Sequence, residues 1–179
     1  RDFDFEPWPE FAEALNIVCA EIFKFAIEWS RSRKWRKTGV LWWSLVDMWP
    51  MLFNYSVVDS NYRRKQPCYD WIRQAQQPFC LLIADPAAGD LELFAANDTL
   101  QAQRGEYRIV SVVTTGKERE LLAGQFAVEP NQNQLLRPVP RPAAQALWIV
   151  EWQADGRRSF NHFVTGQPPY DFGVYQSWC

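Results

Sequence analysis

Short runs of β-branched and aromatic residues, separated by turn-forming residues, fill the chain after Pro78. Runs of this kind, recurring about every ten residues, predict an antiparallel β-sandwich of immunoglobulin-like type. The dipeptide Asp155-Gly156 between the last two runs favours a tight hairpin, because both residues tolerate a left-handed backbone. We therefore predict a sandwich domain over residues 79–179. The runs occupy residues 79–84, 90–97, 105–115, 118–129, 131–139, 145–154 and 157–166.

The first 78 residues follow a different pattern, which is helical at its start. Between Trp8 and about Trp35, apolar residues recur every three or four positions and form one stripe. Pro9 falls in the first turn, where its missing N–H costs nothing. The basic run at residues 31–37 is predicted to be a solvated helix end, since cations suit a helix C-terminus, and Gly39 follows as a stop signal. The stripe consists of Phe11, Leu15, Val18, Ile22, Phe25, Ala26 and Trp29.

The stretch "VLWWSLV" at residues 40–46 is apolar without alternation, which predicts a strand buried on both faces. A short helix is predicted over residues 67–77, ending before Pro78. Two helices cannot cover both faces of that strand, whereas a helix–strand–helix is the repeat of a parallel α/β barrel. We therefore predict that residues 1–78 are the C-terminal helix–strand–helix of a (β/α)₈ barrel, so that the chain is a barrel remnant followed by a sandwich.

Charge and cysteine usage narrow the classes of function. The net charge of −2 gives no electrostatic reason to expect nucleic acid or an anionic membrane as a partner. No apolar run approaches the roughly 20 residues that span a bilayer. The cysteines form no C-x-x-C pair and His162 is the only histidine, so we expect no metal and no cofactor. Cys68 and Cys80 could form a disulfide, but buried free thiols are favoured.

Four stretches carry a family resemblance: "TGVLWWSLVDMWP" (38–50), "YSVVDSNYRRKQPCYDWIRQAQQP" (55–78), "LELFAANDTL" (91–100) and "NHFVTGQPP" (161–169). In this order they resemble the C-terminal portion of glycoside hydrolase family 2, especially its β-mannosidase-like and β-galactosidase-like members. The most specific element is W-x-x-x-D after an apolar strand start. The resemblance covers essentially the whole chain, and it implies the eighth strand and helix of a catalytic barrel followed by a sandwich domain.

The resemblance places a sugar site at the end of the predicted strand. Trp43 matches the family's tryptophan that floors the subsite for the terminal sugar, because an indole face packs against the C–H face of a pyranose. Asp47 matches an aspartate that accepts hydrogen bonds from sugar hydroxyls, although an acid here could instead cap the loop turn. Trp49 either joins this substrate-binding set or packs beneath the following loop. Trp42 points the opposite way along a strand and is expected in the core.

The residues that the chain lacks bear on its activity. Retaining glycosidases need two carboxylates about 5–5.5 Å apart, and the family takes them from the fourth and seventh barrel strands, the acid within an Asn-Glu pair. The sequence contains no Asn-Glu pair and one predicted barrel strand. We therefore expect no catalytic residue in this chain and no activity of the chain alone. The loop charges Asp59 and residues 63–65 are expected to be solvated rather than sugar-binding.

Two functions from different classes fit these patterns. The first is the C-terminal fragment of a retaining exo-β-glycosidase for terminal β-mannosides or related β-glycosides. The partners of this fragment would be the sugar and the upstream barrel. The parent enzyme could be periplasmic, secreted or cytoplasmic. The second is a stand-alone carbohydrate-binding or protein-interaction sandwich with a helical docking arm. An independent module should cover both faces of residues 40–46, whereas a fragment leaves them bare or dimerises over them.

Overall fold

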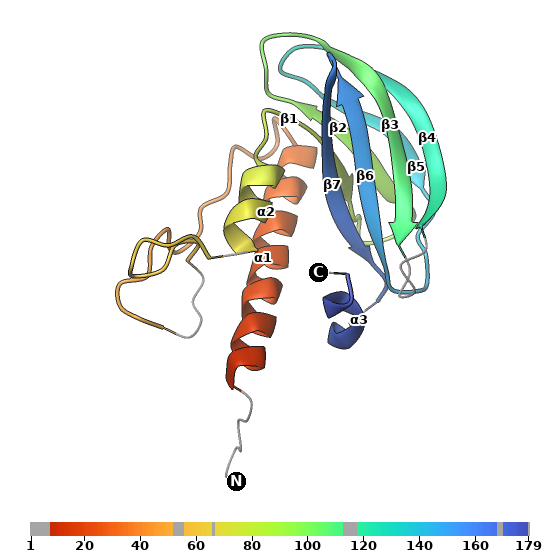
Figure 1. Cartoon of the computed structure of the whole chain (residues 1–179). Helices are drawn as coiled ribbons and strands as arrows, with labels where there is room; N and C mark the ends of the chain where they lie inside the picture. Colours follow the sequence, from red (N-terminus) through yellow and green to blue (C-terminus); the bar gives the residue numbers. More distant parts are fainter. Residues whose placement is uncertain (1–7, 52–55, 66, 113–117, 168–169, 179) are drawn as a thin grey trace. The chain divides into compact units, whose positions relative to one another are not determined.

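The computed structural model describes residues 8–51, 56–65, 67–112, 118–167 and 170–178. The chain divides into two compact units. The first unit comprises Arg1–Ile27 and Gly39–Gln76, and the second comprises Glu28–Thr38 and Gln77–Cys179. The long helix α1, Trp8–Ser32, therefore contributes its last residues to the second unit (Figure 1).

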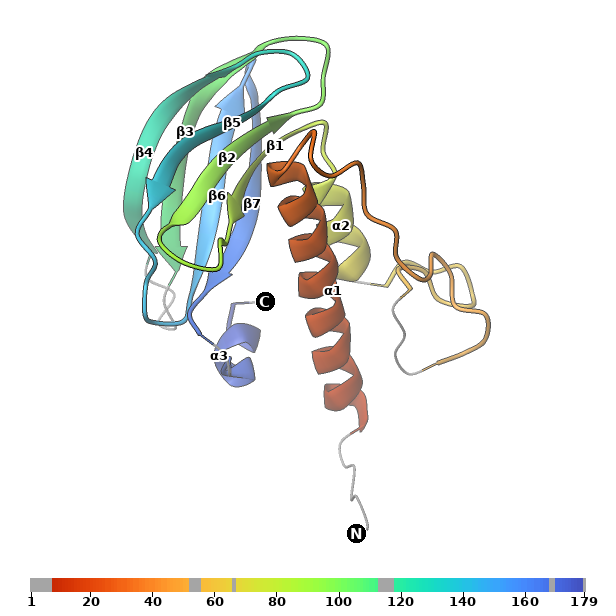
Figure 2. The ribbon, with the colours of Figure 1, turned by 180° about the vertical axis from the view of Figure 1, so that it is seen from behind.

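The first unit is built on α1 and the short helix α2, Cys68–Ala75, which lie side by side (Figures 1 and 2). Both predicted helices are confirmed. Trp42 packs against the cluster between them, with its ring centroid 5.7 Å from that of Phe23, which confirms its expected place in the core. The buried cluster consists of Ala20, Phe23, Ile27, Val57, Cys68, Ile72 and Ala75.

The apolar stripe predicted for α1 is not the face of the helix that is buried. Four of its residues, Phe11, Val18, Ile22 and Phe25, are exposed. The buried positions Ala20, Phe23 and Ile27 lie on the opposite side of the helix, toward α2. Since α1 is apolar on both sides, the position of the second helix decides which side is covered, and sequence periodicity alone cannot.

The strand predicted at residues 40–46 does not form, which corrects the expected helix–strand–helix. The segment makes one isolated parallel bridge, between Val46 and Val58. Leu41, Trp43 and Leu45 in this segment are exposed, while the residues between them are partly covered. A strand requires a ladder of hydrogen bonds to a neighbouring strand, and among the described residues this segment has only the short stretch around Val58 as a neighbour. The expected burial on both faces is therefore wrong as well.

The second unit contains two antiparallel sheets, which confirms the predicted β-sandwich (Figures 1 and 2). The sheets run in the order β1-β2-β5 and β4-β3-β6-β7, and a short helix, α3 at Phe172–Gln176, follows the last strand. The strands are β1 Phe79–Ala84, β2 Leu91–Asn97, β3 Gln103–Val112, β4 Glu118–Val128, β5 Asn133–Val139, β6 Ala146–Ala154 and β7 Arg157–Thr165.

The strands of the sandwich follow their local sequence patterns closely. The β6 strand alternates buried and partly buried residues along its whole length, with Trp148 and Trp152 turned into the core between the sheets. The predicted hairpin after it is confirmed, since Asp155 and Gly156 have φ angles of 48° and 76°, as a two-residue turn requires. Pro138 is tolerated because β5 is an edge strand of its sheet.

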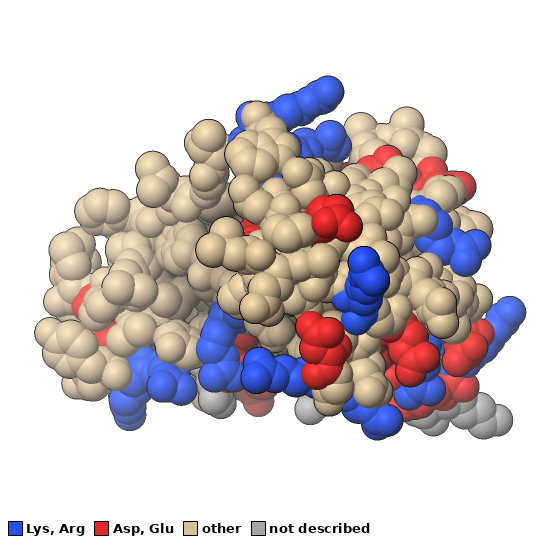
Figure 3. Space-filling view, turned by 90° about the horizontal axis from the view of Figure 1, so that it is seen from above, with Lys and Arg blue, Asp and Glu red and all other residues tan. Residues whose placement is uncertain are grey.

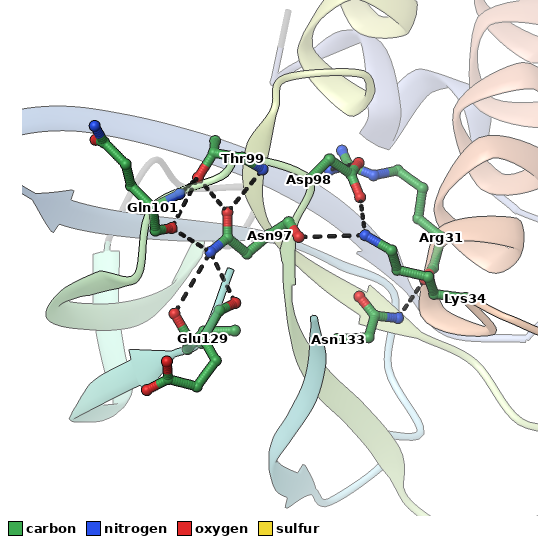
Figure 4. A network of polar contacts seen from close by, with 9 residues as sticks. Arg31, Lys34, Asn97, Asp98, Thr99, Gln101, Glu129 and Asn133 are labelled. Carbon is green, nitrogen blue, oxygen red and sulfur yellow. Dashed lines mark hydrogen bonds and ion pairs between the residues drawn. The ribbon is translucent and has the colours of Figure 1, made fainter. Parts of the chain in front are cut away.

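A polar network at one end of the sandwich involves the basic run after α1 (Figure 4). Asp98 binds Arg31 at 2.9 Å and Lys34 at 2.6 Å, and Asn133 donates a hydrogen bond to the carbonyl oxygen of Arg31. Arg31 and Lys34 are largely buried, so the prediction of a solvated helix end is wrong for these two residues. Residues 28–38 are part of the second unit for this reason.

Candidate functional site

The loops that carry the predicted site residues form one hydrogen-bonded cluster in the first unit. We call residues 45–49 and 56–65 the loop cluster. Its backbone is tied by hydrogen bonds from the Asp47 amide to the Val58 carbonyl (3.0 Å), from the Val58 amide to the Leu45 carbonyl (3.1 Å), and from the Lys65 amide to the Val57 carbonyl (3.0 Å). The two segments therefore hold each other in place, although neither belongs to a sheet.

Asp47 lies at the centre of the loop cluster and is buried. One carboxylate oxygen accepts a hydrogen bond from the Ser56 hydroxyl, and the other forms an ion pair of 2.6 Å with the Lys65 ammonium group. The side chains of Asp47 and Lys65 are 1% and 11% exposed. Breaking a buried pair by removing one partner is costly, because it leaves the other charge uncompensated. The carboxylate thus joins the two segments of the loop cluster.

The next turn, residues 59–63, is closed by the side chain of Asp59. One of its carboxylate oxygens accepts hydrogen bonds from the amides of Asn61 and Arg63, and the other accepts one from the Arg63 guanidinium, all at 2.8 Å. The Arg63 amide, with the other bonds of the turn, lowers the pKa of the Asp59 carboxyl below its ordinary value of 3.8. Tyr62, at the tip of the turn, has a left-handed φ of 61°.

Of the three predicted sugar-binding residues, two are exposed and one is buried. Trp43 is 75% exposed and Trp49 is 55% exposed, so both indoles present a face to solvent. The Asp47 carboxylate is buried and contacts Ser56 and Lys65, so it does not face solvent. The loop prediction holds for Arg63, which is largely exposed, and is wrong for Lys65, which is buried.

Sequence reasoning missed the partners of Asp47. Ser56 and Lys65 lie nine and eighteen positions further along the chain, and nothing in their neighbourhood marks them as partners of an acid. Tyr62 was missed too, since a left-handed backbone at a tyrosine has no sequence signature comparable to Asn-Gly or Asp-Gly. The only available signal was indirect: a buried carboxylate needs a compensating cation, and residues 63–65 are all basic.

A second candidate surface lies on the outer face of the four-stranded sheet. A shallow depression of about 910 Å³ is lined by side chains of β4, β3, β6 and β7. Arg108 and Glu151 pair across its floor, and the hydrogen bond that Arg108 donates to the Glu151 carboxylate raises the pKa of the Arg108 guanidinium. Phe160 is exposed at its edge. The mixture of acids, bases and amides offers both donors and acceptors to a polar ligand.

Within the described residues, the cysteines are free thiols and no cluster of metal ligands occurs. Cys19, Cys68 and Cys80 are buried free thiols, which confirms the preference over a Cys68–Cys80 disulfide. Burial raises the pKa of the Cys68 thiol to about 11. Across these parts of the chain, no group of three His, Cys, Asp or Glu side chains could hold a metal ion, and no helix is long and apolar enough to cross a membrane.

Charged side chains are mixed on the surface that Figure 3 shows. Lysine and arginine residues lie among aspartate and glutamate residues there, and the coloured part of that face presents no large area of one sign. The pattern agrees with the small net charge of −2. Such a face lacks the basic stripe that nucleic-acid binding proteins present.

The helical unit and the β-sandwich together are similar in fold to part of a larger solved structure. The particular solved structure is a β-D-mannosidase from Dictyoglomus thermophilum, which matches 84% of this chain with a TM-score of 0.71 and 22% sequence identity. The chain spans 19% of the length of that enzyme chain. Protein-family models and curated protein sequences give no match. The resemblance drawn from the four sequence stretches is thus confirmed at the level of the fold.

Proposed function

We propose that this chain is the C-terminal portion of a retaining exo-β-glycosidase, whose substrates are terminal β-mannosides or related β-glycosides. Its first unit is the end of the catalytic (β/α)₈ barrel, and its second is the sandwich domain that follows. Both catalytic glutamates belong to the missing upstream barrel, so this chain supplies part of the sugar site and no catalytic group.

The observation that carries this proposal is the bare side of residues 41–45. Leu41 is fully exposed and Trp43 and Leu45 are mostly exposed, although the Leu45 carbonyl accepts backbone hydrogen bonds from residues 57 and 58. Apolar area of this kind on a soluble protein marks a surface that another part of a protein covers. A preceding barrel strand would cover it and supply the missing ladder. The fold shared with about a fifth of a β-D-mannosidase supports the same assignment.

Within this site we assign Trp43 as the platform for the terminal sugar and Trp49 as a second aromatic wall. A fixed indole offers a large apolar face at low cost in conformational entropy. The observed bonds of Asp47 favour a positioning role, in which the carboxylate holds the loop cluster that carries Trp49. A direct contact between Asp47 and a sugar hydroxyl stays a prediction, and it requires the loop cluster to open, because the Asp47 side chain is 1% exposed.

Activity assays test whether the catalytic carboxylates lie in the upstream barrel and not in this chain. The purified chain, mixed with aryl β-mannoside and aryl β-galactoside, is expected to release no aryl alcohol above the rate in buffer. Turnover at rates ordinary for enzymes, about 1–10³ s⁻¹, would show that the chain holds its own catalytic carboxylates, and the proposal would be abandoned.

Binding of methyl β-mannoside tests the platform itself. Trp43→Ala is expected to weaken binding at least fivefold, measured by ligand-observed NMR, because the stacking face is removed. Trp35→Ala is the matched control, since Trp35 is 70% exposed and lies in the second unit. Equal affinities of the two variants would contradict the assignment of Trp43.

The depression on the four-stranded sheet supports a second candidate, a sandwich that itself binds carbohydrate. Phe160 beside paired charges and glutamines could contact a sugar ring and its hydroxyls. The titration with methyl β-mannoside distinguishes the two candidates. A sugar site on the sandwich predicts that Phe160→Ala loses binding and that Trp43→Ala keeps it.

A further inference from the structure

Tyr62 has a backbone conformation that tyrosine rarely adopts. Its φ of 61° lies in the left-handed region, where glycine is at ease and a residue with a Cβ is strained. Its side chain is 82% exposed. Within the described residues the Tyr62 side chain makes no hydrogen bond and no ring contact, so its packing does not explain a tyrosine here. Strained residues that packing does not explain cluster at functional sites.

The turn keeps this conformation through other residues. The Asp59 carboxylate accepts the hydrogen bonds of Asn61 and Arg63 described above, and the Asp59 amide donates to the Arg63 carbonyl at 2.8 Å. The Tyr62 amide donates to the Asp59 carbonyl at 2.9 Å. The turn is therefore closed by the backbone and by Asp59. The exposed Tyr62 side chain makes none of these bonds.

The same turn is tied to the segment that carries the exposed tryptophans. Val58 bridges Arg64 on one side and Val46 on the other. Lys65, directly after the turn, pairs with Asp47. Tyr62 lies two residues before Arg64, in the turn that the Val58–Arg64 bridge closes. The backbone segments that carry Tyr62 and Trp49 are therefore joined by hydrogen bonds and by the Asp47–Lys65 ion pair.

We propose that Tyr62 is a specificity-determining residue that contacts the second sugar of a β-linked oligosaccharide, the unit next to the one held at Trp43. This inference rests on the proposed function. A tyrosine suits the role, because its ring packs on the C–H face of a pyranose while its hydroxyl exchanges hydrogen bonds with the sugar. Two rotatable bonds make its ordering cheap on binding.

The test titrates the chain with methyl β-mannoside, which has one sugar, and with β-linked mannobiose, which has two. Tyr62→Gly removes the ring and suits the left-handed backbone, so it is expected to melt at the same or a higher temperature. We expect it to weaken mannobiose binding at least threefold and to leave methyl β-mannoside binding unchanged. Tyr62→Phe is expected to keep more than half of the mannobiose affinity, because the ring remains.

The outcomes separate the two proposals. Trp43→Ala is expected to weaken both ligands, and if it weakens neither, the sugar platform of the proposed function fails. If Trp43→Ala weakens both while Tyr62→Gly binds mannobiose as the unsubstituted chain does, the inference on Tyr62 fails alone. Equal weakening of both ligands by Tyr62→Gly would place the ring at the first sugar and overturn the assignment to the second. An unsubstituted chain that binds neither ligand overturns both proposals.

Discussion

At the scale of single residues, two polar side chains hold neighbouring turns in place by hydrogen bonds to nearby backbone groups. Asn97, fully buried at the end of β2, donates to the carbonyl oxygens of Gln101 (2.8 Å) and Glu129 (3.0 Å) and accepts from the amide and hydroxyl of Thr99 (Figure 4). Asp59 does the same for an exposed turn. Both are Asx residues whose short side chains reach nearby backbone groups.

Replacing Asn97 with alanine should destabilise the sandwich by about 3 kcal/mol, since several partly buried carbonyl and amide groups lose their partner at once. The measurement is the urea midpoint of unfolding, followed by far-UV circular dichroism. Thr99→Val is the graded control: it removes the hydroxyl bonds only and should cost about 1 kcal/mol. An Asn97→Ala midpoint equal to that of the unsubstituted chain would contradict this role.

The turn at residues 59–63 should open in acid. Its carboxyl has a pKa below 3.8 when folded, so the folded turn binds a proton less readily than the unfolded chain. The stabilisation is therefore complete above about pH 4 and is lost as the pH falls through the lowered pKa. The amide proton shift of Arg63, followed by NMR, should titrate with that pKa. In Asp59→Asn, which keeps an acceptor but has no charge, the same amide should show no such titration.

At the scale of elements, the sandwich depends on close backbone approach between its central strands. Gly105 in β3 pairs with Ala154 in β6. A Cβ at Gly105 would stand 1.8 Å from the carbonyl oxygen of Gln153, which is backbone and cannot turn aside. Glycine at this point is a packing requirement of the sheet and not a feature of a turn.

Gly105→Ala should consequently destabilise the sandwich by about 1–3 kcal/mol, the usual cost of overpacking. Thermal unfolding monitored by circular dichroism measures the effect. Gly39→Ala is the matched control, because a Cβ there meets no atom within 4 Å. Equal melting temperatures for the two variants would mean that β3 and β6 can separate locally without loss.

At the scale of the whole molecule, the described surface carries apolar side chains that a soluble protein normally covers. Leu41, Trp43, Leu45, Met48 and Trp49 are exposed along one short segment of the first unit. Burying each leucine is worth about 1.5–3 kcal/mol. In the full enzyme that we propose, contact with the upstream barrel buries these side chains. In the isolated chain, contact with a second copy can bury them.

The isolated chain should therefore self-associate as its concentration rises, which sedimentation velocity can measure. The double substitution Leu41→Ser and Leu45→Ser should weaken the association at least tenfold, since tenfold corresponds to only about 1.4 kcal/mol. Leu100→Ser, at an equally exposed leucine in the sandwich unit, should leave it unchanged. A chain that stays monomeric at all concentrations would argue against a bare barrel surface.

The sandwich could be predicted from sequence nearly strand by strand because its signals are local. Alternation along β6 and the Asp155-Gly156 turn each depend on neighbours within a few residues. The candidate site was less accessible. Trp43 and Asp47 entered through a resemblance, while the pairing of Asp47 with Lys65 and the backbone of Tyr62 have no local signal.

The sequence by itself determined the helices, the strands of the sandwich and their turns, since side-chain alternation and backbone preference act over a few residues. Only the tertiary structure decided which side of α1 is buried, whether residues 40–46 form a strand, and which cation neutralises Asp47. Each of these depends on a partner distant in the chain, because burial, ladder hydrogen bonds and charge compensation are properties of pairs of segments.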